Sequence, residues 1–538
     1  MLIQRQLIAG VACCLVASLS QAATDRMLGF GPSGLISRSA ATRISVQPAA
    51  HAGSYSLTAA VYEYQPDGTL ASLPLANGVK VIPGSGSEPY WVEANLPHPG
   101  LYSLSVAQQD GNGTVVAEGR TTLARLLAEP PTLLQDVGVV THFAQGKGSP
   151  AISLRMVSQA GFGRIRDELN WDHVEPIAGK FSFPSGYDQY IKTANDLGLR
   201  PLVVLGYTNA RAYPSLFAGA QNKFPITADQ QRQFGNYVGA VVQRYKYAVK
   251  DWEIWNEPTG QNFGDKNWIG YTNFARLVTS KVREQSPDAT VIACGGGGAG
   301  GGPGGTCIGP MLQAGAGKFV DGFSIHPYMA PYDPDNGYEA KNSPIPRVNV
   351  STVGPHLQRM IAAHGTDIRP MSIWATEVGW YSSPTDARTS EILQASYVSR
   401  LILETRRYTE IKATFWYDFQ DDGTNRNNRE HNFGLIRTDF SPKPAYLAAA
   451  TTAASIGNLP WSSTLIDTNQ VKAYTYGRDQ SVVAVWTTTP GGKTLALPIH
   501  PGTYILRDWR GVDTAVSVGK APLAVHVNDM PVFLIKKH

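Results

Sequence analysis

The feature that most constrains the fold is a long central stretch, residues 132–456, in which short apolar runs alternate with helical patterns. Runs rich in apolar and β-branched residues are typical of strands buried on both faces of a parallel sheet. The eight runs read, in order, VGVVTHF, FGRIRDEL, PLVVLGY, DWEIWNEP, ATVIACG, GFSIHPY, MSIWATEVGW and KATFWYDF. Amphipathic stretches such as DQQRQFGNYVGAVVQRYKY lie between them. Eight alternating strands and helices predict an α/β fold, a (β/α)8 TIM barrel.

Two regions that flank this stretch show short alternating strands separated by turns. Residues 24–131 contain YSLTAAVYEY and GLYSLSVAQQ, and residues 457–538 contain SVVAVWTTT and GTYILRDWRG. Asp-Gly pairs between the runs are typical of hairpins. We therefore predict antiparallel β-sandwich-like domains on both sides of the barrel. Neither carries a catalytic motif. A spacing role is favoured for the C-terminal domain, whereas glycan binding and packing both stay open for the N-terminal one.

The first residues predict export. Residues 1–23 combine Arg5, an apolar run over 7–19 and a small-residue cleavage pattern at 20–22, which together indicate a secretory signal peptide. No later segment reaches the roughly 18 apolar residues of a membrane span. The expected location is therefore exported, with periplasmic and extracellular both open. The net charge is +4, and the Lys and Arg residues are scattered along the sequence. This pattern does not indicate a binding surface for nucleic acid. We expect a monomer.

The cysteine and glycine pattern points to a disulfide and away from a nucleotide site. Cys294 and Cys307 are the cysteines that remain after the signal peptide, and they enclose the stretch GGGGAGGGPGGT. In an oxidising compartment such a pair is a disulfide candidate. No Gly-Lys-Ser/Thr ending follows the glycines, so a phosphate loop is disfavoured. The histidines show no ligand spacing, and neither a metal nor a cofactor is expected.

Polar and aromatic residues gather at the ends of the predicted strands. Strand ends or the positions just after them carry Arg166 and Trp171 (second), Asn256 and Glu257 (fourth), His326 and Tyr328 (sixth), Glu377 and Trp380 (seventh), and Trp416 (eighth). In this fold the chemistry sits at the carboxyl ends of the strands, which all meet at one mouth. The set therefore predicts one functional site there.

Two of these motifs carry a family resemblance. WNEP and ATEVGW resemble the signature of the retaining glycoside hydrolases of clan A, with an acid/base Glu after Asn on strand 4 and a nucleophile Glu on strand 7. RIRDELNWDHVEPIAGKF and FWYDFQDDG, followed by EHNFGL, most resemble family 39 and related bacterial exopolysaccharide-degrading hydrolases. The resemblance covers the whole barrel. It implies that Glu257 is the acid/base and Glu377 the nucleophile.

The chemistry of glycoside cleavage requires one carboxylic acid and one carboxylate. Glu257 must carry a proton near neutral pH, and its neighbours Trp255 and Pro258 are expected to keep it dry and thereby to favour the protonated form. Glu377 must stay ionised and needs hydrogen-bond donors, and the resemblance implies that Arg166 and Tyr328 reach it from their strand ends. The expected substrate-binding residues are Asn256, Arg166, His326, Tyr328, Trp171, Trp380 and Trp416, with the three tryptophans as sugar platforms. Glu253 is expected to face the barrel interior and Asp418 to fix a loop.

These observations predict an enzyme, a secreted retaining glycosidase that hydrolyses O-glycosyl compounds. Its expected partner is a polysaccharide or oligosaccharide, cleaved by double displacement within the chain of an exopolysaccharide or plant-type glycan. Two alternatives stay open at this point. One is an exo-acting, β-xylosidase-like glycosidase, and the other is a non-catalytic carbohydrate-binding protein on a barrel scaffold.

Overall fold

A computed structural model of the protein describes residues 28–50, 53–84, 88–217, 224–258, 268–296, 307–340, 345, 347–364 and 370–537. The predicted signal peptide, residues 1–23, lies outside these ranges. The chain divides into two compact units, of which the first ends at Arg125 and the second runs from Leu126 to the C-terminal end.

The first unit is built from two four-stranded sheets. Their orders are β1-β3-β6-β5 and β2-β8-β7-β4. The strands are β1 Gly29–Phe30, β2 Ile36–Ser37, β3 Ala41–Gln47, β4 Tyr55–Glu63, β5 Val79–Ile82, β6 Tyr90–Asn95, β7 Gly100–Asp110 and β8 Val115–Arg125. Pairing is antiparallel except between β2 and β8. Alternate residues such as Ile44, Val46 and Val61 are fully buried, as expected where one face of each sheet packs on a core.

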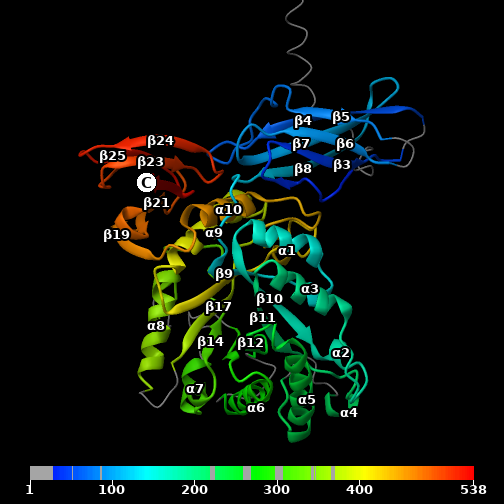
Figure 1. Ribbon diagram of the computed structural model, residues 1–538, viewed down its shortest axis with the longest axis vertical. Coiled ribbons are helices and arrows are strands. Elements are labelled where there is room, and N and C mark those ends of the chain that lie inside the picture. Colours follow the sequence, from blue (N-terminus) through cyan, green and yellow to red (C-terminus); the bar gives the residue numbers. More distant parts are fainter. Residues whose placement is uncertain are drawn as a thin grey trace, which may run out of the picture. The chain divides into compact units, whose positions relative to one another are not determined.

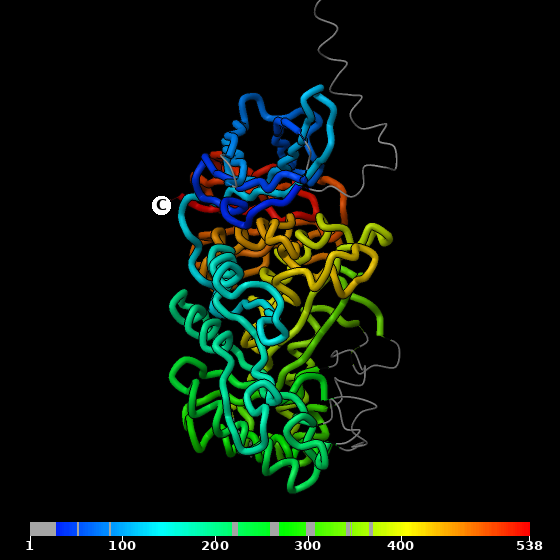
Figure 2. The backbone as a smooth tube through the Cα atoms, turned by 90° about the vertical axis from the view of Figure 1, so that its right-hand side faces the viewer, coloured from blue at the N-terminus to red at the C-terminus, as the bar shows by residue number. Residues whose placement is uncertain are grey.

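The second unit contains the predicted barrel, which is confirmed. The described residues form a closed barrel in the order β10-β11-β12-β13-β14-β17-β18-β9. Its strands are β9 Leu134–Val140, β10 Phe162–Asn170, β11 Arg200–Gly206, β12 Asp251–Ile254, β13 Thr290–Ala293, β14 Gly322–Ile325, β17 Ser372–Val378 and β18 Ile411–Trp416. All neighbours pair in parallel, and β18 pairs with β9 to close the ring. In Figure 2 this closure brings the cyan and yellow parts of the chain together.

Helices cover the outside of the barrel, as Figure 1 shows for α1, α3, α5, α6, α7 and α8. The helices are α1 Pro150–Gln159, α2 Trp171–Val174, α3 Ser185–Asp196, α4 Pro214–Phe217, α5 Ala228–Tyr245, α6 Ile269–Gln285, α7 Ile308–Gln313, α8 Val350–Ala362, α9 Glu391–Thr405 and α10 Pro444–Ile456. Local sequence fixes several starts. Thr227 and Asn349 each close a capping box, and Pro occupies the first turn of α1 and α10. A short β15–β16 ribbon, Tyr338–Glu339 with Arg347–Val348, precedes α8.

The C-terminal part of this unit is a β-domain. A six-stranded sheet, β19-β20-β21-β26-β23-β24, packs with the pair β22-β25 over one apolar core. The strands are β19 Trp461–Asp467, β20 Val471–Tyr476, β21 Val482–Thr487, β22 Lys493–Leu497, β23 Gly502–Arg507, β24 Asp513–Val518, β25 Leu523–Val527 and β26 Val532–Lys536. The sheet also touches the barrel, because the Tyr476 hydroxyl donates to the Leu403 carbonyl of α9 at 2.8 Å.

Two sequence expectations can be placed on this fold. Cys294 and Cys307 form the predicted disulfide, while most of the glycine stretch between them, residues 297–306, lies outside the described ranges. Among the helices that the structure describes, none combines the length and apolar character that a membrane span requires.

Candidate active site

A cleft of about 750 Å³ opens at the carboxyl ends of the barrel strands. It is lined by Val140, Thr141, His142, Gln145, Arg166, Asp167, Glu168, Tyr207, Trp255, Asn256, Glu257, Tyr328, Ala330, Glu377, Tyr381, Tyr417, Arg429, Glu430 and Phe433. This is the end of the fold at which chemistry is expected. Five of the nine predicted catalytic and substrate-binding residues line this cleft, namely Arg166, Asn256, Glu257, Tyr328 and Glu377.

The two predicted catalytic glutamates face each other across the cleft. Glu377 lies on β17 and is only 7% exposed, whereas Glu257 follows β12 with a side chain that is 52% exposed. One carboxylate oxygen of each lies within 4.8 Å of the other. His326 lies between them, with its Nδ1 3.1 Å from Glu257 Oε1 and 3.4 Å from Glu377 Oε2. Since Nδ1 faces two acceptors, the ring hydrogen is assigned to this nitrogen.

Arg166 organises the floor of the site. Its guanidinium donates to Glu253 at 2.6 Å, to Glu377 at 2.7 Å and to Asn256 at 2.8 Å. The Tyr328 hydroxyl donates to the second oxygen of Glu377 at 2.9 Å. Burial alone would raise the pKa of Glu377, but His326, Arg166 and the Tyr328 hydroxyl together hold that pKa below its usual range. The carboxylate of Glu377 is therefore kept ionised by its surroundings.

Glu253 contributes to this network more directly than the sequence indicated. It is fully buried, as expected for a residue that faces the barrel interior. One of its oxygens accepts from Arg166 and the other accepts from the Thr376 hydroxyl at 2.9 Å. Alternation along β12 was the available signal, because it assigns Glu253 to the inner face. It could not reveal that Glu253 and Glu377 share one arginine.

The backbone at the end of β12 is unusual. Trp255 and Glu257 have φ of 64° and 46°, in the left-handed region that side chains rarely adopt. Such positions cost about 1–3 kcal/mol each and persist where the surroundings fix them. One expectation is corrected here. Trp255 is buried among Tyr207, Phe234 and Phe274, whereas half of the Glu257 side chain is exposed. Trp255 therefore stabilises the core and does not keep Glu257 dry.

The three tryptophans predicted as sugar platforms lie in the core instead. Trp171, Trp380 and Trp416 are at most 1% exposed, and the rings of Trp380 and Trp416 stack on each other at 5.7 Å. A buried ring offers no face to a sugar, so this expectation is corrected. The next residues in the sequence, Tyr381 and Tyr417, line the cleft. Successive side chains of an extended chain point to opposite sides, which explains the difference of one position.

His142 also lines the cleft, and no sequence motif pointed to it. His142 follows β9 and lies 3.1 Å from an Asp422 oxygen and 3.7 Å from an Asp418 oxygen. Burial would lower its pKa, but the hydrogen bond to Asp422 and the charges of both aspartates raise the pKa of His142 to about 9. Asp418 is buried, but within the described residues neither of its carboxylate oxygens has a hydrogen-bond partner, so the expected loop-fixing role is not supported.

Two groups of side chains gather potential metal ligands. Within the described ranges, one group consists of His142, Asp418 and Asp422, and the other consists of Glu257, His326 and Glu377. In each group, one donor atom from every member lies within 4.8 Å of the others. In both groups a cation of the protein already compensates a carboxylate. Lys147 lies 2.7 Å from Asp422, and Arg166 lies 2.7 Å from Glu377. This compensation weakens the attraction of either group for a metal ion.

Comparisons with known sequences give a partial match. No protein-family model matches the chain. Endo-1,4-beta-xylanase A of Phanerodontia chrysosporium is 28% identical over 134 residues, which cover 24% of this chain. The match spans about a third of that relative's length, 32%.

Comparison with solved structures is more decisive. A family 39 enzyme from Xanthomonas axonopodis pv. citri shares the fold, with a TM-score of 0.52 and 16% identity over 76% of this chain and 94% of its own. A family 39 glycoside hydrolase from the gut symbiont Bacteroides cellulosilyticus WH2 is 32% identical, with a TM-score of 0.80, and the match covers 95% of this chain and 100% of that one. On this match the chain belongs to glycoside hydrolase family 39, and it is a clan A glycosidase that acts on O-glycosyl compounds.

Proposed function

We propose that the protein is an exported, retaining glycosidase that cleaves a polysaccharide within its chain, with Glu257 as acid/base and Glu377 as nucleophile. The observation that carries this proposal is the approach of the two carboxylates to within 4.8 Å. Retaining glycosidases hold their catalytic carboxyl groups about 5–5.5 Å apart, whereas inverting enzymes leave room for a water between them. The close approach therefore supports double displacement.

In the first step, an oxygen of Glu377 attacks the anomeric carbon as the glycosidic bond breaks. Glu257 donates its proton to the departing oxygen, and a covalent glycosyl-enzyme forms. In the second step, Glu257 removes a proton from a water, which attacks the anomeric carbon and releases Glu377. Arg166 and Tyr328 support this cycle because they bind both oxygens of Glu377 as it gains and loses negative charge.

Four further residues are placed to assist. Arg166 holds the Asn256 carbonyl oxygen, which leaves the amide NH2 of Asn256 free to donate to a sugar hydroxyl next to the reacting carbon. His326 contacts Glu257 and orients its carboxyl group. Tyr381 and Tyr417 offer ring faces at the cleft for sugar stacking, in place of the tryptophans that the sequence suggested.

The substrate proposal rests on the cleft and on the relative. A cleft of about 750 Å³ with several aromatic side chains at its wall has room for more than one sugar unit, which supports cleavage within a chain. The matched relative is named an endo-1,4-beta-xylanase, which supports a β-1,4-linked polysaccharide of the plant type. An exo-acting, β-xylosidase-like enzyme is distinguished by its products, because it releases single sugars from the outset.

The test combines a substrate panel with one substitution. Purified protein is incubated with xylan, β-glucan, mannan and bacterial exopolysaccharides, and product length and the anomeric form of the first product are followed by chromatography and NMR. Glu377→Gln is expected to abolish turnover while glycan binding is retained. Glu284→Gln, on the exposed face of α6, is the matched control and should keep full activity. A first product of inverted configuration, or binding with no turnover by the wild type, would contradict the proposal.

A further inference from the structure

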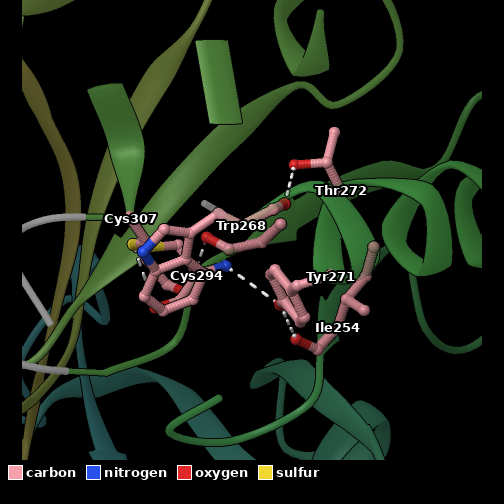
Figure 3. Close-up of a disulfide and its surroundings, with 8 residues drawn as sticks. Ile254, Trp268, Tyr271, Thr272, Cys294 and Cys307 are labelled. Atoms are coloured by element: carbon pink, nitrogen blue, oxygen red, sulfur yellow. Dashed lines mark hydrogen bonds between the residues drawn. A yellow bond between two sulfur atoms is a disulfide. The ribbon is translucent and has the colours of Figure 1, made fainter. Parts of the chain in front are cut away.

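We propose that the Cys294–Cys307 disulfide positions the side chain of Glu257 for proton transfer; this inference rests on the acid/base role proposed above. Cys294 directly follows β13, the strand that pairs with β12 in the barrel. Figure 3 shows the disulfide beside Trp268, and it shows the Cys294 N–H bonded to the Tyr271 hydroxyl. Glu257 itself follows β12, so the disulfide and the acid/base lie at neighbouring strand ends.

The residues that follow Cys294 pack directly against Glu257. The backbone N–H of Glu257 donates to the Gly295 carbonyl. A Cβ added to Gly296 would lie 2.7 Å from the Cα of Glu257, and one added to Gly295 would lie 2.6 Å from a Glu253 oxygen. Because neither glycine has room for a side chain, the backbone of residues 295–296 lies directly against its neighbours. We infer that this backbone determines the position of Glu257.

The same region concentrates unusual backbone conformations. Trp255, Glu257, Trp268 and Cys294 have φ of 64°, 46°, 60° and 81°, all in the left-handed region that glycine favours. A residue with a side chain stays in this region only where its neighbours hold it there. The neighbours of Cys294 and Glu257 therefore hold both residues in these conformations. A change in the conformation of one is expected to let the backbone of the other relax as well.

A disulfide and a backbone hydrogen bond both restrain Cys294. The disulfide joins it to Cys307 at the start of α7, and both cysteines are fully buried. Its N–H also donates to the Tyr271 hydroxyl at 3.2 Å, which in turn donates to the Ile254 carbonyl of β12 at 2.6 Å (Figure 3). Without the disulfide, Cys294 loses its covalent link to the start of α7. Its backbone is then free to relax and to carry Gly295 away from Glu257.

If the disulfide positions Glu257, the effect of its removal on kcat/KM should depend on the leaving group of the substrate. A general loss of stability predicts no such dependence. Proton donation matters where the departing oxygen is basic, as in a phenyl glycoside or a glycan, and hardly matters for 2,4-dinitrophenolate. A displaced Glu257 therefore lowers the rate of hydrolysis of phenyl glycosides and glycans and leaves that of dinitrophenyl glycosides unchanged. A generally loosened barrel would disturb Glu377 as well and would slow both.

The kinetic experiment uses Cys294→Ala/Cys307→Ala, with phenyl and 2,4-dinitrophenyl glycosides of the sugar that the panel identifies. We expect kcat/KM for the phenyl glycoside to fall roughly tenfold to hundredfold, and that for the dinitrophenyl glycoside to change by less than about twofold. Val157→Ala, a buried position on α1, is the control for lowered stability and should leave the ratio of the two rates unchanged. Equal losses on both substrates would overturn the proposal.

A second measurement needs no substrate. Hydrogen exchange followed by mass spectrometry reports the amide of Glu257, whose acceptor is Gly295. We expect peptides covering 251–258 to exchange at least about tenfold faster in the variant, and peptides of α1 to be unchanged. Cys307→Ala alone serves if the double variant does not fold. Unchanged exchange at 251–258 would refute the positioning role. A wild type that exchanges as expected but hydrolyses no glycoside would instead contradict the proposed function.

Discussion

Glu377 is the residue whose charge the site controls most closely. Its pKa is held low by His326 and by Arg166 and Tyr328, of which the last two each bind one of its oxygens. Tyr328→Phe removes one donor, and the pKa of Glu377 is expected to rise. Since a nucleophile must be ionised, activity is lost as pH falls through this pKa. The acidic limb of kcat/KM should therefore move to higher pH, and kcat/KM at neutral pH should fall by roughly tenfold to hundredfold.

The control for this prediction is a tyrosine of the same kind outside the site. The Tyr504 hydroxyl in the C-terminal β-domain donates to the His500 carbonyl at 3.0 Å. Tyr504→Phe should leave the pH profile of kcat/KM where it is in the wild type. A Tyr328→Phe enzyme whose acidic limb does not move would show that the hydroxyl does not stabilise the charge of Glu377.

Replacing Glu253 should change the pKa of Glu377 in the direction opposite to the change expected for Tyr328→Phe. Glu253 shares Arg166 with Glu377, so Glu253→Gln leaves the positive charge of Arg166 to Glu377 alone. The pKa of Glu377 is then expected to fall further, and the acidic limb of kcat/KM should move to lower pH. Unfolding in urea should also show a loss of about 1–3 kcal/mol, because a charged hydrogen bond in the core is weakened. An acidic limb that moves upward, as for Tyr328→Phe, would contradict this account.

At the scale of elements, the sequence predicts the strands better than the directions of their side chains. All eight barrel strands could be recognised, because buried parallel strands are apolar without interruption and their polar ends meet at one mouth. The prediction that tryptophans form the sugar platforms was wrong because Trp416 and Tyr417 are neighbours at a strand end. There, a shift of one position exchanges a side chain in the core for one in the cleft. The sharing of Arg166 between Glu253 and Glu377, 87 and 211 positions away, follows from the closed barrel and from no local pattern.

The difference between Trp416 and Tyr417 can be tested directly. Tyr417→Ala removes a ring that lines the cleft, and glycan affinity is expected to fall by about threefold to tenfold. Trp416→Phe removes part of a buried ring, and it should lower the free energy of unfolding by about 1–3 kcal/mol with affinity unchanged. Binding is measured by calorimetry in the Glu377→Gln background, and stability by urea unfolding. Loss of affinity in Trp416→Phe at full stability would restore the platform role to the tryptophan.

At the scale of the whole molecule, the C-terminal β-domain is more than the spacer that its sequence suggested. Arg400 of α9 is fully buried and donates to Asp335 at 2.6 Å and to Asp333 at 2.9 Å. Trp486 of β21 donates to the other Asp335 oxygen at 3.0 Å. The two aspartates lie in the loop that follows His326 and Tyr328. Barrel and β-domain therefore share one buried polar network, which agrees with their forming a single compact unit.

This shared network predicts how the second unit unfolds. Arg400→Met leaves Asp333 and Asp335 without their buried cation, and breaking such a pair costs about 3–5 kcal/mol. In scanning calorimetry and urea unfolding, the transition of residues 126–538 should shift by that amount as one step, because both parts lose the same contact. The transition of the first unit should not move. Arg388→Met is the matched control, because Arg388 is 63% exposed beside Asp386, and it should change stability by less than about 1 kcal/mol. A β-domain that unfolds by itself in the wild type, before the barrel, would show that the network does not couple them.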